Sequence, residues 1–233
     1  MALLAAVRDG LAGLADPVRA PAMQAYMKSD LPFRGVTSPA AKTLFGQVLR
    51  AHPLTDPVSW QDTVRELWDG ARYREERYAA TALVADRAYA TFRDPSVLPL
   101  LDHLVVSGAW WDHVDALATR TVGPLVRAYQ AELVPVMLTW ARDGDLWRRR
   151  TAILHQVGAK DATDTGLLAR CLEPSLASTE FFLRKAIGWA LRDLAWRDAA
   201  WVQEYVRAHA QVLSGLSRRE ALKNCGPEQV TGE

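Results

Sequence analysis

Residues 180–196 read EFFLRKAIGWALRDLAW and carry the period of an amphipathic α-helix. At about 100° per residue, apolar side chains gather on one face. That face consists of Leu183, Ile187, Ala190, Leu191 and Leu194. The opposite side carries Lys185, Trp189, Arg192 and Trp196, in steps of four, three and four residues. The pattern predicts a helix with one face in the core. The other face either contacts a ligand or is covered by a further helix layer.

The rest of the 233-residue chain shows the same helical spacing, without a convincing two-residue alternation of the kind that marks strands. Cap-like residues followed by proline recur, and proline at the first helical position loses no hydrogen bond. These pairs are Asp16-Pro17, Ser38-Pro39, Asp56-Pro57, Asp94-Pro95, Gly123-Pro124 and Glu173-Pro174. We predict about a dozen helices of roughly 10–18 residues. The fold class is all-α, an α-solenoid of HEAT-like antiparallel helix pairs with a concave face. A globular helical bundle is the alternative.

The composition describes a folded chain, which we expect to form a single domain over residues 1–233. It is 49% hydrophobic and 24% charged, and it contains no uninterrupted apolar run of membrane-spanning length. Charged residues interrupt the apolar start, which predicts an amphipathic helix and not a signal peptide. Cys171 and Cys225 lack metal-ligand spacing and fit a reducing compartment. We therefore expect a cytoplasmic location.

The charge balance by itself does not indicate a nucleic-acid-binding protein. The net charge is only +1, so DNA binding requires that positive charge be concentrated locally. Such a concentration occurs opposite the core face of residues 180–196. Cations there can contact phosphates, and flat rings can contact sugars or bases. This surface favours a nucleic-acid backbone as the ligand.

Residues 109–122, AWWDHVDALATRTV, predict a second informative helix. Its buried stripe consists of Trp110, Val114, Leu117 and Thr121. Trp111 and Asp115, four residues apart, lie beside each other at the rim of that stripe. The Asp115 carboxylate could be solvated, ion-paired, part of a helix cap or catalytic, and spacing alone favours a solvated or ion-paired group. No serine or cysteine nucleophile accompanies the neighbouring His113.

Residues 145–160, DLWRRRTAILHQVGAK, contain three consecutive arginines. Leu146, Ile153 and Val157 mark the core face. Arg148 points away from the core, whereas Arg149 and Arg150 flank it. Arginine runs are usually solvated, but the spacing predicts that Arg150 is partly buried and needs a carboxylate or phosphate partner.

Several segments together resemble the AlkD family of DNA alkylpurine glycosylases, which are HEAT-like repeat proteins. The segments occur in order over nearly the whole chain. They are MQAYMKSDLPFRGVTSP (23–39), VRELWD (64–69), WWDHVD (110–115), LWRRRTAIL (146–154), EFFLRKAIGWALRDLA (180–195) and LSRREALK (216–223).

The resemblance implies an α-solenoid whose concave face holds duplex DNA. It implies excision of cationic N3- and N7-alkylpurines without flipping of the base into a pocket. By position in the motifs, Asp115 matches the catalytic aspartate, and Trp111 matches the aromatic residue one turn before it. Trp189 matches the family's second aromatic residue, and Arg150 matches its arginine before the AIL run. Tyr26 matches a DNA-proximal aromatic residue of the family.

We therefore expect double-stranded DNA with alkylated purines as the partner of a monomer that needs no cofactor. The five histidines form no metal-ligand spacing. The expected DNA-binding residues are Tyr26, Arg148, Arg149, Lys185, Arg192, Trp196, Arg218 and Arg219. Two other interpretations remain, an inactive member that binds distorted DNA and a helical scaffold that binds another protein through its tryptophans.

Overall fold

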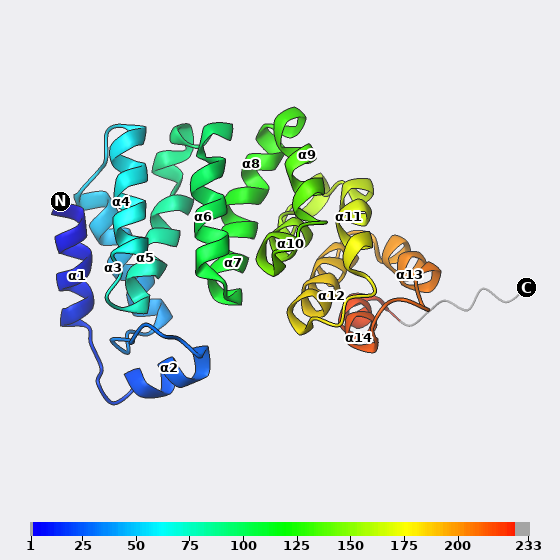
Figure 1. Ribbon diagram of the computed structural model, residues 1–233, viewed down its shortest axis with the longest axis horizontal. Coiled ribbons are helices and arrows are strands. Elements are labelled where there is room, and N and C mark those ends of the chain that lie inside the picture. The colour runs from blue at the N-terminus through cyan, green and yellow to red at the C-terminus, as the bar shows by residue number, and fades with distance from the viewer. Residues whose placement is uncertain (1, 227–233) are drawn as a thin grey trace, which may run out of the picture. The chain divides into compact units, whose positions relative to one another are not determined.

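The computed structural model describes residues 2–226, and all of its secondary structure is helical. In this range there are fourteen α-helices, joined by short 3₁₀ and π turns, and no strand (Figure 1). The predicted all-α class is confirmed. No helix of the described range is both long enough and apolar enough to span a bilayer.

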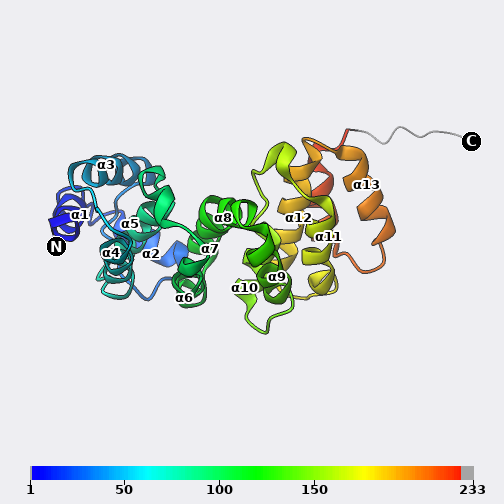
Figure 2. The same cartoon turned by 90° about the horizontal axis from the view of Figure 1, so that it is seen from above.

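The chain divides into two compact units, Met1–Arg93 and Asp94–Glu233. The single domain expected from the sequence and the curvature of a solenoid stay predictions. In the first unit, α1, α3, α4 and α5 lie side by side, nearly end-on in Figure 2. The short α2 lies beyond their ends in Figure 1. This unit contains α1 (Ala2–Gly13), α2 (Ala20–Met27), α3 (Ser38–Ala51), α4 (Pro57–Asp69) and α5 (Arg74–Ala85).

Over its described residues, which end at 226, the second unit holds nine α-helices, several of them shorter than predicted. Helices α7, α8 and α14 have only six or seven residues, against the 10–18 expected. The first helices of the unit are α6 (Leu98–Gly108), α7 (Trp111–Leu117), α8 (Gly123–Ala128), α9 (Gln130–Trp140) and α10 (Leu146–Leu154). They are followed by α11 (Thr165–Leu172), α12 (Phe181–Ala195), α13 (Ala199–Ala208) and α14 (Gly215–Ala221).

Caps and core stripes explain the positions of several helices. The Asp56 carboxylate accepts a hydrogen bond from the Ser59 amide at 2.8 Å, and Pro57 is the first residue of α4. The predicted core face of α12 is confirmed, because all five of its apolar residues are buried. Caps without a following proline were not predicted, since a lone polar residue is not distinctive. They are Asp145, Asp164, Asp198 and Ser214.

A π turn joins α7 to α8, at Ala118–Val122. The Gly123 amide donates to the carbonyl oxygen of Ala118, five residues back. Single π turns inside helices are frequent at functional sites. A Cβ atom on Gly123 would lie 1.9 Å from the carbonyl oxygen of His155, the residue after α10. Glycine at this position therefore lets α8 approach the end of α10.

Gly123→Ala is expected to lower the free energy of unfolding by about 1–3 kcal/mol, because the added methyl group must displace the His155 backbone. Gly46→Ala in α3 is the matched control. The nearest atom to a Cβ there is the Arg50 Nη1 atom at 3.4 Å. This control should gain about 0.5–1 kcal/mol, because alanine favours a helix. Urea unfolding measures both, and an equal effect of the two variants would contradict the close approach.

Candidate functional site

A bidentate ion pair between Asp115 and Arg150 links α7 to α10. The Arg150 Nε atom donates to Asp115 Oδ1 at 2.7 Å, and Nη2 donates to Oδ2 at 2.8 Å. The third nitrogen, Nη1, donates to the backbone carbonyl of Phe182 in α12. The predicted need of Arg150 for a carboxylate or phosphate partner is thereby confirmed. One guanidinium ties three helices together.

Aromatic rings surround this pair. The Phe182 ring centroid lies 5.3 Å from that of Trp110 and 5.1 Å from that of Trp147. The Arg150 guanidinium carbon lies 5.9 Å from the Phe182 ring centroid. Trp110 is half-buried in this cluster and not fully buried as predicted, whereas Val114, Leu117 and Thr121 are buried as expected.

The Asp115 carboxylate is nearly but not completely buried. Its side chain is 16% exposed, against 5% for Arg150. Burial raises the pKa of the Asp115 carboxyl above its ordinary value of 3.8, and the hydrogen bonds from Arg150 oppose that rise. Trp111, one helical turn before Asp115, is half-buried, which agrees with the predicted rim position. The site therefore contains an ion-paired carboxylate that is shielded from most solvent, on a side chain that keeps a small exposed area.

The three consecutive arginines have three different partners. Arg148 makes two hydrogen bonds of 2.7 Å to Asp102 and lies 3.5 Å from Asp143. Arg149 donates to the hydroxyl of Ser175, at 2.9 Å from Nη2. The sequence did not identify these partners, because Asp102 precedes Arg148 by 46 residues.

The predicted cationic stripe of α12 is partly covered by α14. Lys185 and Arg192 both form ion pairs with Glu220 of α14. Trp189 is half-buried against the core of this unit, whereas Trp196 is 73% exposed. A further helix therefore covers part of this face. Ligand contact by the groups that remain exposed stays a prediction.

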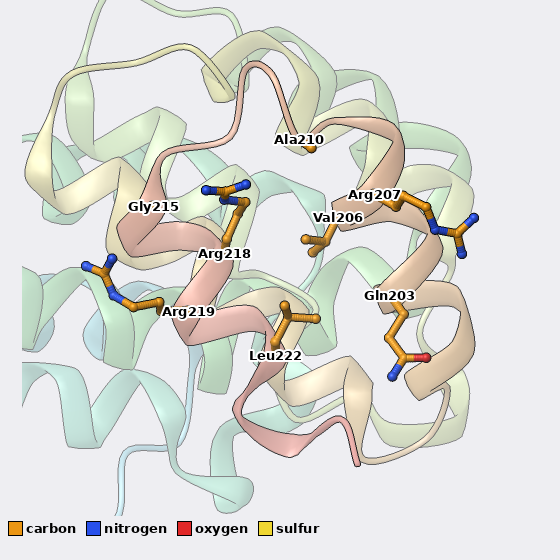
Figure 3. A pocket seen from close by; sticks show the side chains of 8 residues that line it. All are labelled: Gln203, Val206, Arg207, Ala210, Gly215, Arg218, Arg219 and Leu222. Atoms are coloured by element: carbon orange, nitrogen blue, oxygen red, sulfur yellow. The ribbon is translucent and has the colours of Figure 1, made fainter. Parts of the chain in front are cut away.

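Arg218 and Arg219 border a groove between α13 and α14, with a volume of about 390 Å³. Figure 3 shows Val206 and Leu222 facing each other across it. The side chains of Arg219 and Arg207 diverge from the groove on opposite sides (Figure 3). In the first unit, Tyr26 is 76% exposed on α2. DNA contact by these residues stays a prediction.

The three arginines should differ in their contribution to stability. Arg150→Met is expected to lower the free energy of unfolding by about 3–5 kcal/mol, because it leaves the buried Asp115 carboxylate unpaired. Arg149→Met loses hydrogen bonds to one hydroxyl and should cost about 1 kcal/mol. Arg148→Met leaves two half-exposed carboxylates and should cost at most about 1 kcal/mol. Urea unfolding at neutral pH measures the three losses in free energy of unfolding. Equal losses at all three positions would contradict the different partners that the structure gives these arginines.

Comparison with known proteins agrees with this picture. The family model described as DNA alkylation repair enzyme matches residues 7–225. A solved structure described as a predicted DNA alkylation repair enzyme from Enterococcus faecalis is 29% identical, with a TM-score of 0.78. The match covers 90% of this chain and 95% of that one. No curated protein matches. The chain belongs to the DNA alkylation repair enzyme family, as its sequence resemblance predicted.

Proposed function

We propose that the protein is a DNA glycosylase that hydrolyses the N-glycosidic bond of cationic N3- and N7-alkylated purines in duplex DNA. The observation that carries this proposal is the Asp115 carboxylate, held by Arg150 among aromatic rings on a side chain that keeps a small exposed area. The base is not flipped into a pocket, and the carboxylate stabilises the cationic sugar.

The chemistry requires little of the protein beyond negative charge at the right place. Alkylation at N3 or N7 leaves the purine with a formal positive charge. When the bond to C1′ breaks, its electron pair moves into the purine ring, and the base leaves neutral without protonation by an acid. Water then adds to C1′ and loses a proton. The developing positive charge on the sugar is the species that needs stabilisation.

Asp115 can supply that stabilisation although Arg150 is bonded to it. The guanidinium lies on one side of the carboxylate and makes two hydrogen bonds, so the remaining lone pairs point elsewhere. A sugar cation at the exposed area would lie closer to the carboxylate oxygens than to the guanidinium. Attraction therefore exceeds repulsion. Arg150 keeps the carboxylate ionised and oriented.

Aromatic and cationic residues complete the proposed site. The indole faces of Trp111 and Trp189 suit a cationic sugar or base, at about 0.5–2 kcal/mol each. Phosphates on the bound duplex are expected to contact the exposed cations. We assign DNA contacts to Tyr26, Lys185, Arg192, Trp196, Arg218 and Arg219. Arg149 adds positive charge while its guanidinium donates to Ser175, whereas Asp102 and Asp143 compensate the charge of Arg148.

The bidentate pairing of Asp115 with Arg150 also favours a second candidate, a member that binds damaged DNA with little or no excision, because the guanidinium compensates the carboxylate charge. In that case the wild-type protein would bind methylated duplex DNA and release no base from it. Measuring binding and base release on the same DNA separates the two candidates.

Asp115→Asn is expected to slow release of 7-methylguanine and 3-methyladenine from methylated duplex DNA by at least about 100-fold, because the charge that stabilises the sugar is lost. DNA affinity should change little. Asp102→Asn is the matched control, because Asp102 also forms a bidentate pair, with Arg148. It should excise at nearly the wild-type rate. Thermal unfolding checks that both variants fold. Unchanged release by folded Asp115→Asn would refute the assignment.

Arg150→Gln should move the low-pH limit of the single-turnover excision rate upward. Arg150 holds down the pKa of Asp115, so its removal lets burial raise that pKa further. The active carboxylate is then protonated at a higher pH than in the wild-type protein. Arg150→Lys should shift the limit in the same direction by less, and Arg148→Gln should leave it in place. An unshifted limit in both Arg150 variants would show that Asp115 does not set it.

A further inference from the structure

Three cations from two helices meet at one carboxylate, that of Glu220. The Lys185 Nζ atom lies 3.3 Å and the Lys223 Nζ atom 2.8 Å from Glu220 Oε1. Arg192 donates to the other oxygen. The side chains of Lys185, Arg192 and Lys223 are 39%, 30% and 54% exposed, against 11% for Glu220. The carboxylate is therefore the inner part of the cluster, and the cations face solvent.

The cluster has an excess of positive charge. Three cations and one carboxylate leave a net charge of +2. Two other ion-pair groups of the described chain have the opposite ratio, one cation to two carboxylates. Arg8 lies between the carboxylates of Glu66 and Glu76, and Arg148 lies between those of Asp102 and Asp143. Their carboxylates compensate the cation, whereas the Glu220 cluster lacks an anion.

Packing of α14 against α12 fixes the position of Glu220, which lies in α14. A Cβ atom on Gly188 would lie 2.5 Å from the Glu220 Cβ atom, so the backbones of α12 and α14 are close there. The Ser217 hydroxyl donates to the Arg184 carbonyl at 3.0 Å. Hydrogen bonds from Lys223 and Lys185 lower the pKa of the Glu220 carboxyl to about 2, so it is charged at any physiological pH. The anchor is therefore both rigid and permanently ionised.

We propose that Glu220 is a positioning residue that holds Lys185, Arg192 and Lys223 as a preformed site for a phosphate of bound duplex DNA. Each ammonium has three N–H donors and the guanidinium five. Only part of these contact Glu220, so the remaining donors are available to phosphate oxygens. The exposed Trp196 indole, four residues after Arg192, offers a surface for the adjoining sugar. This inference rests on the proposed action on DNA.

Glu220→Gln separates positioning from simple electrostatics. The change removes a negative charge, so electrostatics alone predicts tighter DNA binding. Positioning predicts the opposite, because the three cations lose their common anchor. We expect roughly 3- to 10-fold weaker binding and a smaller salt dependence, lower by about one in the slope of log affinity against log salt. Fluorescence anisotropy with a methylated duplex at several salt concentrations measures both.

Glu204→Gln is the matched control. Glu204 pairs with Arg207 on the exposed side of α13, and the substitution removes the same charge. It should bind DNA as tightly as the wild-type protein or more tightly. Lys223→Gln alters a largely exposed side chain and should itself lower the salt slope by about 0.9. If Glu220→Gln proves unstable on heating, Lys223→Gln still tests whether this cluster contacts a phosphate.

The outcomes distinguish this inference from the proposed function. If the wild-type protein excises bases and folded Glu220→Gln binds DNA as tightly as Glu204→Gln, the positioning role is wrong. An unchanged salt slope in Lys223→Gln would equally overturn it. If the wild-type protein shows no DNA affinity even at low salt, the proposed function itself fails.

Discussion

The hydrogen bonds of one buried guanidinium, that of Arg150, hold the site together. They connect Asp115 on α7 and the Phe182 carbonyl on α12 to α10. A carboxylate as buried as Asp115 would otherwise favour its neutral form. The ion pair preserves its charge and fixes its direction. The aromatic cluster of Trp110, Trp147 and Phe182 excludes water beside it. The packing of the three helices and the proposed chemistry thus depend on the same contact, the pair of Asp115 and Arg150.

Carboxylates in this protein orient cations as well as neutralising them. With a net charge of +1, the chain has almost as many acidic as basic residues. Asp102 and Asp115 each accept two hydrogen bonds from one arginine, which leaves no local excess of positive charge. Glu220 instead pairs with three cations, which leaves a local excess of positive charge. Positive potential therefore depends on how the acidic residues are distributed in space, and the overall charge says little about it.

The elements that could be predicted are those with a local cause. The Asp56-Pro57 start of α4 and the apolar face of α12 depend on residues within a few positions of each other. The short helices and the π turn before Gly123 were missed. The turn precedes the close approach of Gly123 to His155, a contact between residues far apart in the sequence. Trp111 was correctly placed at a rim, whereas Trp110 was expected to be more buried than it is.

Sequence alone determined the all-helical class, the family and the identity of the candidate residues, because period, caps and motifs are written in neighbouring positions. Only the tertiary structure decided what these residues contact. Arg148 and Arg150 are two positions apart, yet their carboxylates lie 46 and 35 residues away on different helices. Glu220 meets Lys185 and Arg192 from 35 and 28 residues away. No local pattern encodes such pairings, since they arise when helices pack and bring distant charges into a shared, poorly solvated space.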